Sequence, residues 1–309
     1  MMNDIGFNDQ TINVGDVIST KKKIKLANEI HLKFVDDLTI AEAIDLPGTL
    51  IQVPENQRTH PENYHDRTGH TLPPLSSSVH QQVVKTQRFA EDHQMKINFK
   101  KTKLTLFNPC TSLDFSPKML VNDHEIGYVN EVRLLGLTIT SDLKWGSNTE
   151  NLVSKANKRL WILRRLKNLG ASQDALLEVY TKQIRSVLEL GVPVWQGSIS
   201  QNDKILLERV QKCACRIVLG LNYVSYRNSL SQLGLDSLES RRNKLSLKFA
   251  MKAEKDPKFN SWFKPNQIKL NTRTKQNKYC TPFANSQRFQ KSPISFLTAI
   301  LNSHYRNKK

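Results

Sequence analysis

The feature that most constrains the fold is a change in the spacing of apolar residues near residue 142. Before this point, apolar residues alternate with polar ones or form short runs between turn-forming residues, a pattern that favours β-strands. After it, they recur every three or four residues over long stretches that end at Gly or Pro, as helices do. The sequence therefore predicts an α+β protein, with one domain over residues 1–142, a helical domain over 143–263 and a tail over 264–309.

In the first domain, the local patterns predict a short helix and a small mixed sheet. The helix is expected over residues 79–95, where a few apolar positions share one face. Strands are expected over 102–107 and 132–139, together with a hairpin whose turn is at Asn122 and Asp123.

In the second domain, the sequence predicts four helices that pack as a bundle. Their apolar stripes indicate core positions, and the first has the spacing of a capping box at Ser147 and Glu150. The expected helices span residues 147–169, 172–191, 202–219 and 237–256.

Two segments of the chain are poor in apolar residues. Residues 46–78 are rich in Pro, His, Asn, Ser and Thr, which predicts a surface insertion; its histidines have no cysteine or carboxylate in a metal-ligand pattern. Residues 264–309 contain ten Lys and Arg and no Asp or Glu. We expect this basic tail to be largely irregular, with room for one short helix at 294–302.

The charge of the chain indicates an anionic partner. Forty-six Lys and Arg against 28 Asp and Glu give a net charge of +18, which points to nucleic-acid phosphates, with an anionic membrane surface as the alternative. No apolar run is long enough for a transmembrane segment, and no secretion signal is present. Four scattered cysteines favour a reducing compartment, so we expect the protein in the nucleus or cytoplasm.

Asp36 and Asp37 join two β-prone runs, which predicts a tight hairpin with both carboxylates at its tip. Adjacent carboxylates repel each other unless a cation offsets their charge, and Mg²⁺ prefers hard oxygen ligands. The pair is therefore a candidate metal site, and a solvated turn is the alternative interpretation.

Several blocks of the chain, in order, resemble the reverse transcriptases of non-LTR, LINE-type retrotransposons. The hairpin Phe34-Val35-Asp36-Asp37 resembles the central polymerase motif of that family, and the similarity extends over about residues 1–263. The further blocks are Met95-Lys-Ile-Asn98 with Lys101-Thr102-Lys103, Leu134-Leu-Gly-Leu-Thr-Ile139, Ser141-Asp-Leu-Lys-Trp145, a helix over 155–165, and the segments 184–195 and 207–212.

The resemblance implies a partial polymerase palm sheet with the catalytic hairpin, followed by a helical thumb-like bundle. Asp36 would bind catalytic Mg²⁺, Asp37 would assist, and Lys101 would lie near the triphosphate unless it is an ordinary surface lysine. The partners would be an RNA template, a DNA primer and deoxynucleoside triphosphates. The third aspartate of the family belongs to an earlier motif, so we expect this chain to lack a complete site and to be inactive alone.

Two helices carry cations that could bind phosphates. By the resemblance, the helix over 147–169 would hold the template–primer duplex, while a merely solvated charged face is the alternative. The candidate nucleic-acid-binding residues are Lys155, Lys158, Arg159, Arg164, Arg165, Arg241 and Arg242. Trp145 is a candidate for base stacking, whereas Trp161 and Trp195 lie in apolar runs that predict core packing.

Three functions therefore stay open. The first is a truncated reverse transcriptase that still contacts template and primer. The second is a basic RNA- or DNA-binding protein without catalysis, derived from a retroelement. The third is an enzyme completed by a separate chain that supplies the missing aspartate.

Overall fold

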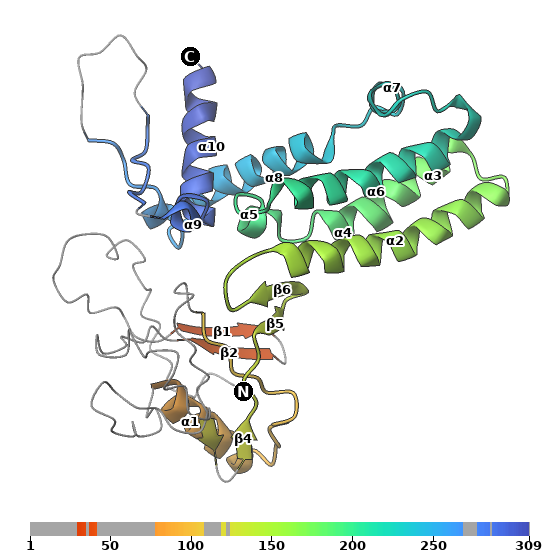
Figure 1. Ribbon diagram of the computed structural model, residues 1–309. Helices are drawn as coiled ribbons and strands as arrows, with labels where there is room; N and C mark the ends of the chain where they lie inside the picture. The colour runs from red at the N-terminus through yellow and green to blue at the C-terminus, as the bar shows by residue number, and fades with distance from the viewer. Residues whose placement is uncertain are drawn as a thin grey trace, which may run out of the picture. The chain divides into compact units, whose positions relative to one another are not determined.

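The computed structural model describes residues 30–34, 37–41, 78–107, 119–121, 124–267, 277–284 and 286–308 (Figure 1). The chain divides into two compact units. One comprises residues 1–132 with 140–143, and the other comprises 133–139 with 144–309. The expected insertion at 46–78 lies outside the described residues apart from Ser78, as do residues 1–29.

The acidic segment forms the expected hairpin. Strand β1 (Ile30–Phe34) pairs antiparallel with β2 (Asp37–Ala41), and Phe34 is the register partner of Asp37. Two positions of the sequence, Val35 and Asp36, lie between the paired strands. Asp37 is thus the first residue of β2, while Asp36 lies outside the described residues.

The rest of the first unit has a small core between one helix and a second hairpin. Helix α1 (Ser78–Asp92) and the hairpin of β3 (Met119–Val121) and β4 (His124–Ile126) confirm two of the expectations. Val121 and Ile126 are buried and pack against Val83, Val84, Phe99 and Leu104. The strand expected over 102–107 is reduced to one parallel bridge, between Leu104 and Tyr128.

The single strand expected over 132–139 is wrong. This segment forms two paired strands, β5 (Glu131–Leu134) and β6 (Leu137–Thr140). Leu135 and Gly136 have φ values of 48° and 85°, and two successive left-handed residues are what a two-residue hairpin turn requires. The described strands form three separate two-stranded sheets in place of one mixed sheet.

The four expected long helices of the second unit are present. The first is α2, and the second is built from α3, a π-helical turn η4, and α4, which follow one another directly. The helices and turns are α2 (Gly146–Asn168), α3 (Gln173–Val179), η4 (Tyr180–Arg185), α4 (Ser186–Leu188), α5 (Val192–Trp195), α6 (Gln201–Leu219), η5 (Gly220–Asn222), α7 (Tyr226–Gln232) and α8 (Leu238–Ala253).

These helices share one apolar core, which confirms the expected bundle. Helix α2 packs along α6, and α6 also contacts α3, α7 and α8 (Figure 1). The core is built from apolar residues of every long helix, including Leu160, Leu163, Ile184, Trp195, Leu207 and Leu238.

The helix starts follow the sequence at Ser172 and Ser237, which are N-caps whose side chains accept a backbone hydrogen bond. Helix α6 begins at Gln201, one residue before the expected start at 202, and its N-cap is Ser200. The capping box expected at Ser147 is wrong, because α2 begins one residue earlier with Trp145 as N-cap. The Oδ1 atom of Asn148 instead accepts a hydrogen bond from the backbone N–H of Thr138, at 3.1 Å.

The tail is more ordered than the sequence predicts. Within the described residues, the tail forms α9 (Gln287–Gln290) and α10 (Pro293–Asn307), and η6 (Asn260–Trp262) comes just before it. Helix α10 packs against α8 and also contacts α5 and α9. Leu297, Leu301 and Tyr279 are buried with Ala250 in a second core. The helix allowed at 294–302 is confirmed and is longer, and the irregular tail is wrong here because its few apolar residues meet partners on α8.

Among the helices that the structure describes, none has both the length and the apolar character needed to cross a lipid bilayer.

Candidate nucleic-acid interface

Helix α2 is held in place by one buried face. Leu152, Ala156, Leu160 and Leu163 recur every three or four residues and are at most 2% exposed. Because a helix has 3.6 residues per turn, this spacing leaves the opposite face in solvent along the whole helix. That outer face is the part of α2 available to a partner.

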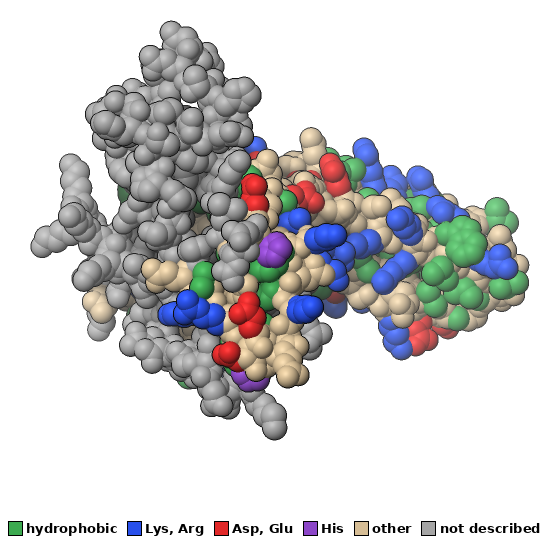
Figure 2. Space-filling model, turned by 90° about the horizontal axis from the view of Figure 1, so that it is seen from below, with side chains coloured by type: hydrophobic (Ala, Val, Ile, Leu, Met, Phe, Trp, Pro, Cys, Tyr) green, Lys and Arg blue, Asp and Glu red, His purple; other side chains and the backbone are tan. Residues whose placement is uncertain are grey.

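The cations predicted for α2 divide between its flanks and its outer face. On the flanks, Arg159 donates to the carbonyl oxygen of Gln183, and Arg164 lies 3.5 Å from the Sγ atom of Cys213. Lys158 and Arg165 are exposed on the outer face, and Lys155 is half-buried. Figure 2 shows Lys and Arg side chains distributed along this part of the molecule.

Among the described residues, no carboxylate forms an ion pair with these cations. In the described part of the chain, the ion pairs are made by other elements, and none includes a Lys or Arg of α2. Lys167, near the end of the helix, donates to the carbonyl oxygens of Ile217 and Val218 at the end of α6. The positive charge of α2 is therefore directed either to carbonyl oxygens or to solvent.

Trp161 lies in solvent, so its expected place in the core is wrong. Its side chain is 59% exposed, and the guanidinium carbon of Arg165 lies 5.7 Å from the centre of its ring. This distance is within the range of a cation–π interaction. A helical count from Leu160 and Leu163 would have found this, because Trp161 falls outside the buried stripe.

Trp195 and Trp145 are buried. Trp195 is fully buried, as expected, and its indole N–H donates to the carbonyl oxygen of Leu190 at 2.7 Å. Trp145, the candidate for base stacking, is only 7% exposed and packs in the bundle core. Trp145 is therefore in the core although the sequence suggests an exposed stacking residue, and Trp161 is exposed although the sequence suggests core packing.

An open groove runs beside this face, between α2 and α6. Its volume is about 550 Å³, and Lys158 forms part of its rim. Glu150 also lines it and would repel a phosphate at the near end of the helix. The lining residues are Glu150, Val153, Ser154, Asn157, Lys158 and Leu206.

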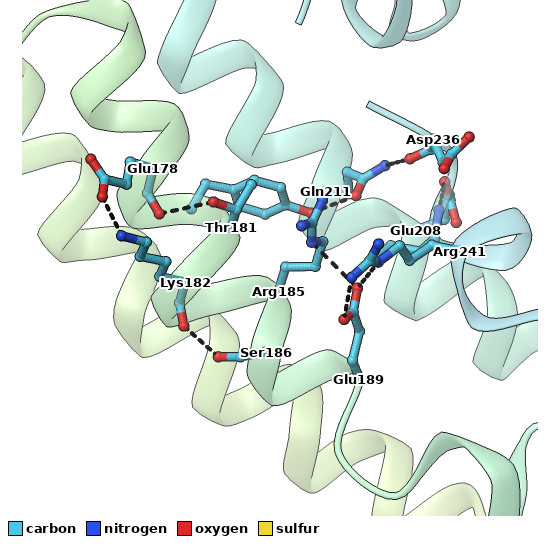
Figure 3. A network of polar contacts seen from close by, with 12 residues as sticks. Glu178, Thr181, Lys182, Arg185, Ser186, Glu189, Glu208, Gln211, Asp236 and Arg241 are labelled. Carbon is cyan, nitrogen blue, oxygen red and sulfur yellow. Dashed lines mark hydrogen bonds and ion pairs between the residues drawn. The ribbon is translucent and has the colours of Figure 1, made fainter. Parts of the chain in front are cut away.

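The candidate Arg241 on α8 is occupied by an internal partner. Its Nε atom donates to Glu189 at 2.8 Å, and this pairing raises the pKa of Arg241. Arg185 contacts the same carboxylate at 3.3 Å (Figure 3). Further along α8, Lys244 pairs with Asp236 at 2.7 Å. Arg241 and Lys244 thus each have a carboxylate partner, which reduces their attraction for phosphates.

Arg242 lies in the interior, so its expected place on the binding surface is wrong. Its side chain is fully buried, and its Nε atom donates to the Oε1 atom of Gln196 at 2.7 Å. Burial lowers the pKa of Arg242, and neighbouring carboxylates such as Glu208 oppose this effect. Its two terminal nitrogens have no hydrogen-bond partner within the described residues.

A buried polar network joins α6 to its neighbours close to Arg242. The Tyr180 hydroxyl donates to Gln211 at 2.5 Å, and the amide of Gln211 donates to Tyr226 and to the backbone of Asp236 (Figure 3). Tyr226 in turn donates to Glu208. Burial raises the pKa of both tyrosine hydroxyls, which keeps them neutral. This network positions α6 and α8 without offering a surface site.

The candidate metal residues belong to the other unit. Asp37 begins β2 and is the register partner of Phe34, while Asp36 lies outside the described residues. Among the described residues, no group of three or more His, Cys, Asp or Glu is placed to hold a metal.

Lys101 lies in the turn that follows α1. Its side chain is exposed, and its backbone N–H donates to the carbonyl oxygen of Asn98 at 3.0 Å. Helix α1 contacts both β2 and β3. Because its side chain is exposed, Lys101 is available to a partner.

No protein-family model, no curated protein and no solved structure matches this chain.

Proposed function

We propose that the chain is part of an RNA-directed DNA polymerase of the non-LTR retrotransposon type, and that its helical unit binds template and primer. In this proposal, residues 1–142 are part of the palm and residues 143–263 are a thumb-like domain. The observation that carries the binding part is the outer face of α2, where cations remain without a neutralising carboxylate. A surface of this kind attracts phosphates without regard to base sequence.

The proposed contribution to catalysis rests on the hairpin and on the family resemblance. Asp36 and Asp37 would hold Mg²⁺ at the hairpin tip, and Lys101 would neutralise charge on the departing pyrophosphate. In nucleotidyl transfer such ions activate the attacking hydroxyl and stabilise the leaving oxygen. The third carboxylate of the family pattern has no counterpart among the motifs that resemble the family here, so we expect no polymerisation by this chain alone.

Primer extension on an RNA template with Mg²⁺ tests the catalytic part. The wild-type chain and Asp36→Ala are compared, and duplex binding is measured in parallel by fluorescence anisotropy at two salt concentrations. We expect salt-sensitive binding by both proteins and extension by neither. Extension that Asp36→Ala abolishes would instead demonstrate a complete active site in this chain.

The second candidate is a nucleic-acid-binding protein without catalysis. The placement of the charged side chains favours it, because the outer face of α2 needs neither a metal nor the hairpin to attract phosphates. To separate the two candidates, a chain that carries the earlier family motif and its aspartate is added to the extension assay. Activity that depends on Asp36 supports the polymerase, and continued inactivity with intact binding supports the second candidate.

A further inference from the structure

The outer face of α2 carries exposed apolar side chains among its cations. Ile162 is 47% exposed, and Leu169, the C-cap of α2, is 74% exposed. They are seven residues apart and so lie near each other around the helix axis, about a quarter of a turn from Trp161. Lys158 precedes Trp161 by three residues and Arg165 follows it by four, so each lies one turn away. Figure 2 shows hydrophobic and cationic side chains next to each other on this part of the molecule.

This face is presented by a rigid element. The inner stripe of the same helix is almost completely buried, and α2 packs along α6 over its length. Arg159 and Lys167 fix the helix further through hydrogen bonds to backbone carbonyls. Trp161 is therefore held in a defined position, which a specific contact requires.

The charge around Trp161 favours an anionic partner. Lys158 and Arg165 lie about 10 Å apart along the helix axis, given a rise of 1.5 Å per residue, with Trp161 between them. Neither cation is paired with a carboxylate in the described part of the chain. Two phosphates on either side of one nucleotide would each meet a cation, and the base between them would meet the indole.

An indole ring offers little to a duplex but much to an unpaired base. In a double helix the faces of the bases are covered by their neighbours, so a protein on the outside reaches only phosphates, sugars and base edges. A single strand exposes base faces, which stack on aromatic rings without sequence preference. Arg165 lies over the ring at 5.7 Å, yet 59% of the Trp161 side chain stays exposed, which leaves area for a base.

We infer that the outer face of α2 is a binding site for single-stranded nucleic acid, in which a base stacks on Trp161 and Lys158 and Arg165 hold the flanking phosphates. This inference rests on the proposed nucleic-acid binding and specifies the substrate as an unpaired stretch. A lipid surface or an apolar protein partner would use Ile162 and Leu169 equally with Trp161, whereas stacking depends on the aromatic ring.

Substitutions at Trp161 that separate aromatic from apolar character test the inference. Binding of a 20-nucleotide oligo(dT) and of a blunt duplex of the same length is measured for wild type, Trp161→Leu, Trp161→Phe and Ile162→Ala. We expect Trp161→Leu to bind oligo(dT) about 5- to 100-fold more weakly, the range for loss of one stacked base. Trp161→Phe and Ile162→Ala should stay close to wild type, because both keep an aromatic ring at position 161.

Intrinsic fluorescence gives an independent reading of the same site. Oligo(dT) should quench the tryptophan emission of wild type, and Trp161→Phe should remove most of this quenching, because Trp145 and Trp195 are buried and the half-buried Trp262 packs against the second core rather than on α2. Unchanged affinity of Trp161→Leu for oligo(dT) would overturn the inference, even with duplex binding intact. Binding to anionic phosphatidylserine vesicles that Ile162→Ala weakens, without binding to oligo(dT), would overturn it as well. If wild type binds neither oligo(dT) nor duplex, the proposed function itself fails.

Discussion

Helices α2 and α8 carry similar numbers of cations, but the surroundings of these cations differ. On α2, Lys158 and Arg165 extend into solvent beside an exposed tryptophan. On α8, Arg241 and Lys244 are paired with Glu189 and Asp236, and Arg242 is buried. Positive charge along a helix is therefore a poor guide to a binding surface until its neighbours are known, because a carboxylate within 3 Å cancels most of the attraction for phosphate.

The largest expected difference between the two helices concerns the arginines themselves. Arg242→Ala removes a fully buried side chain and its hydrogen bond to Gln196, so we expect a loss of about 2–4 kcal/mol in the free energy of unfolding. Arg165→Ala, on the exposed face, should change stability by less than about 0.5 kcal/mol. Urea unfolding followed by circular dichroism measures both.

Binding measurements on the same two variants complete this comparison. Arg165→Ala should weaken nucleic-acid binding, whereas Arg242→Ala should not, when binding is measured at a temperature where the variant is folded. An Arg242→Ala variant that keeps its stability but loses nucleic-acid binding would contradict the assignment of Arg242 to the interior and of Arg165 to the binding surface.

The next effect is in the salt dependence of binding. On a single strand, each phosphate contact contributes about 0.7 to the slope of log affinity against log salt concentration. The double variant Lys158→Ala with Arg165→Ala should therefore flatten the slope for oligo(dT) by about 1.4. The matched double variant Arg241→Ala with Lys244→Ala removes the same charge from α8 and should leave the slope nearly unchanged, because those cations are already neutralised. Equal flattening by both pairs would show that only net charge matters.

The smallest effect concerns a cation of the tail. Lys278 pairs with Glu254 at 2.6 Å, at the end of α8, and the hydroxyls of Tyr279 and Tyr305 donate to the same carboxylate. Burial opposes ionisation of Glu254, but these contacts outweigh it and lower its pKa. A carboxylate with a lowered pKa stabilises the folded state at neutral pH, and this contribution disappears as the pH falls below about 4.3 through the folded pKa.

Thermal unfolding at pH 7 and pH 3 measures this contribution. Glu254→Gln should lower the midpoint at pH 7 and have a smaller effect at pH 3, where Glu254 in the wild type is becoming protonated. The matched change Glu178→Gln removes an exposed pair with Lys182 and should alter little at either pH. Equal destabilisation by Glu254→Gln at both pH values would show that its charge is unimportant.

Local signals predicted much of the fold. The hairpin that includes Asp37, the helix starts at Ser172 and Ser237, and the apolar stripes of the bundle could be predicted, because each depends on residues close together in the sequence. The turn at Leu135 and Gly136 was missed because the apolar residues around it continue without a break. Gly136 was the available signal of a turn at this point.

The sequence by itself determined the charge of the protein, which follows from its composition. It also determined the change from strands to helices near residue 142 and the buried faces of the long helices, since these follow from periodicity along one segment. Only the tertiary structure decided which cations remain available. Glu189 reaches Arg241 from 52 residues away along the chain, Gln196 accepts from Arg242 across the bundle, and Leu297 and Leu301 in the tail find a core on α8. Such partners are distant in sequence, and the loop closures that bring them together depend on the packing of the whole unit.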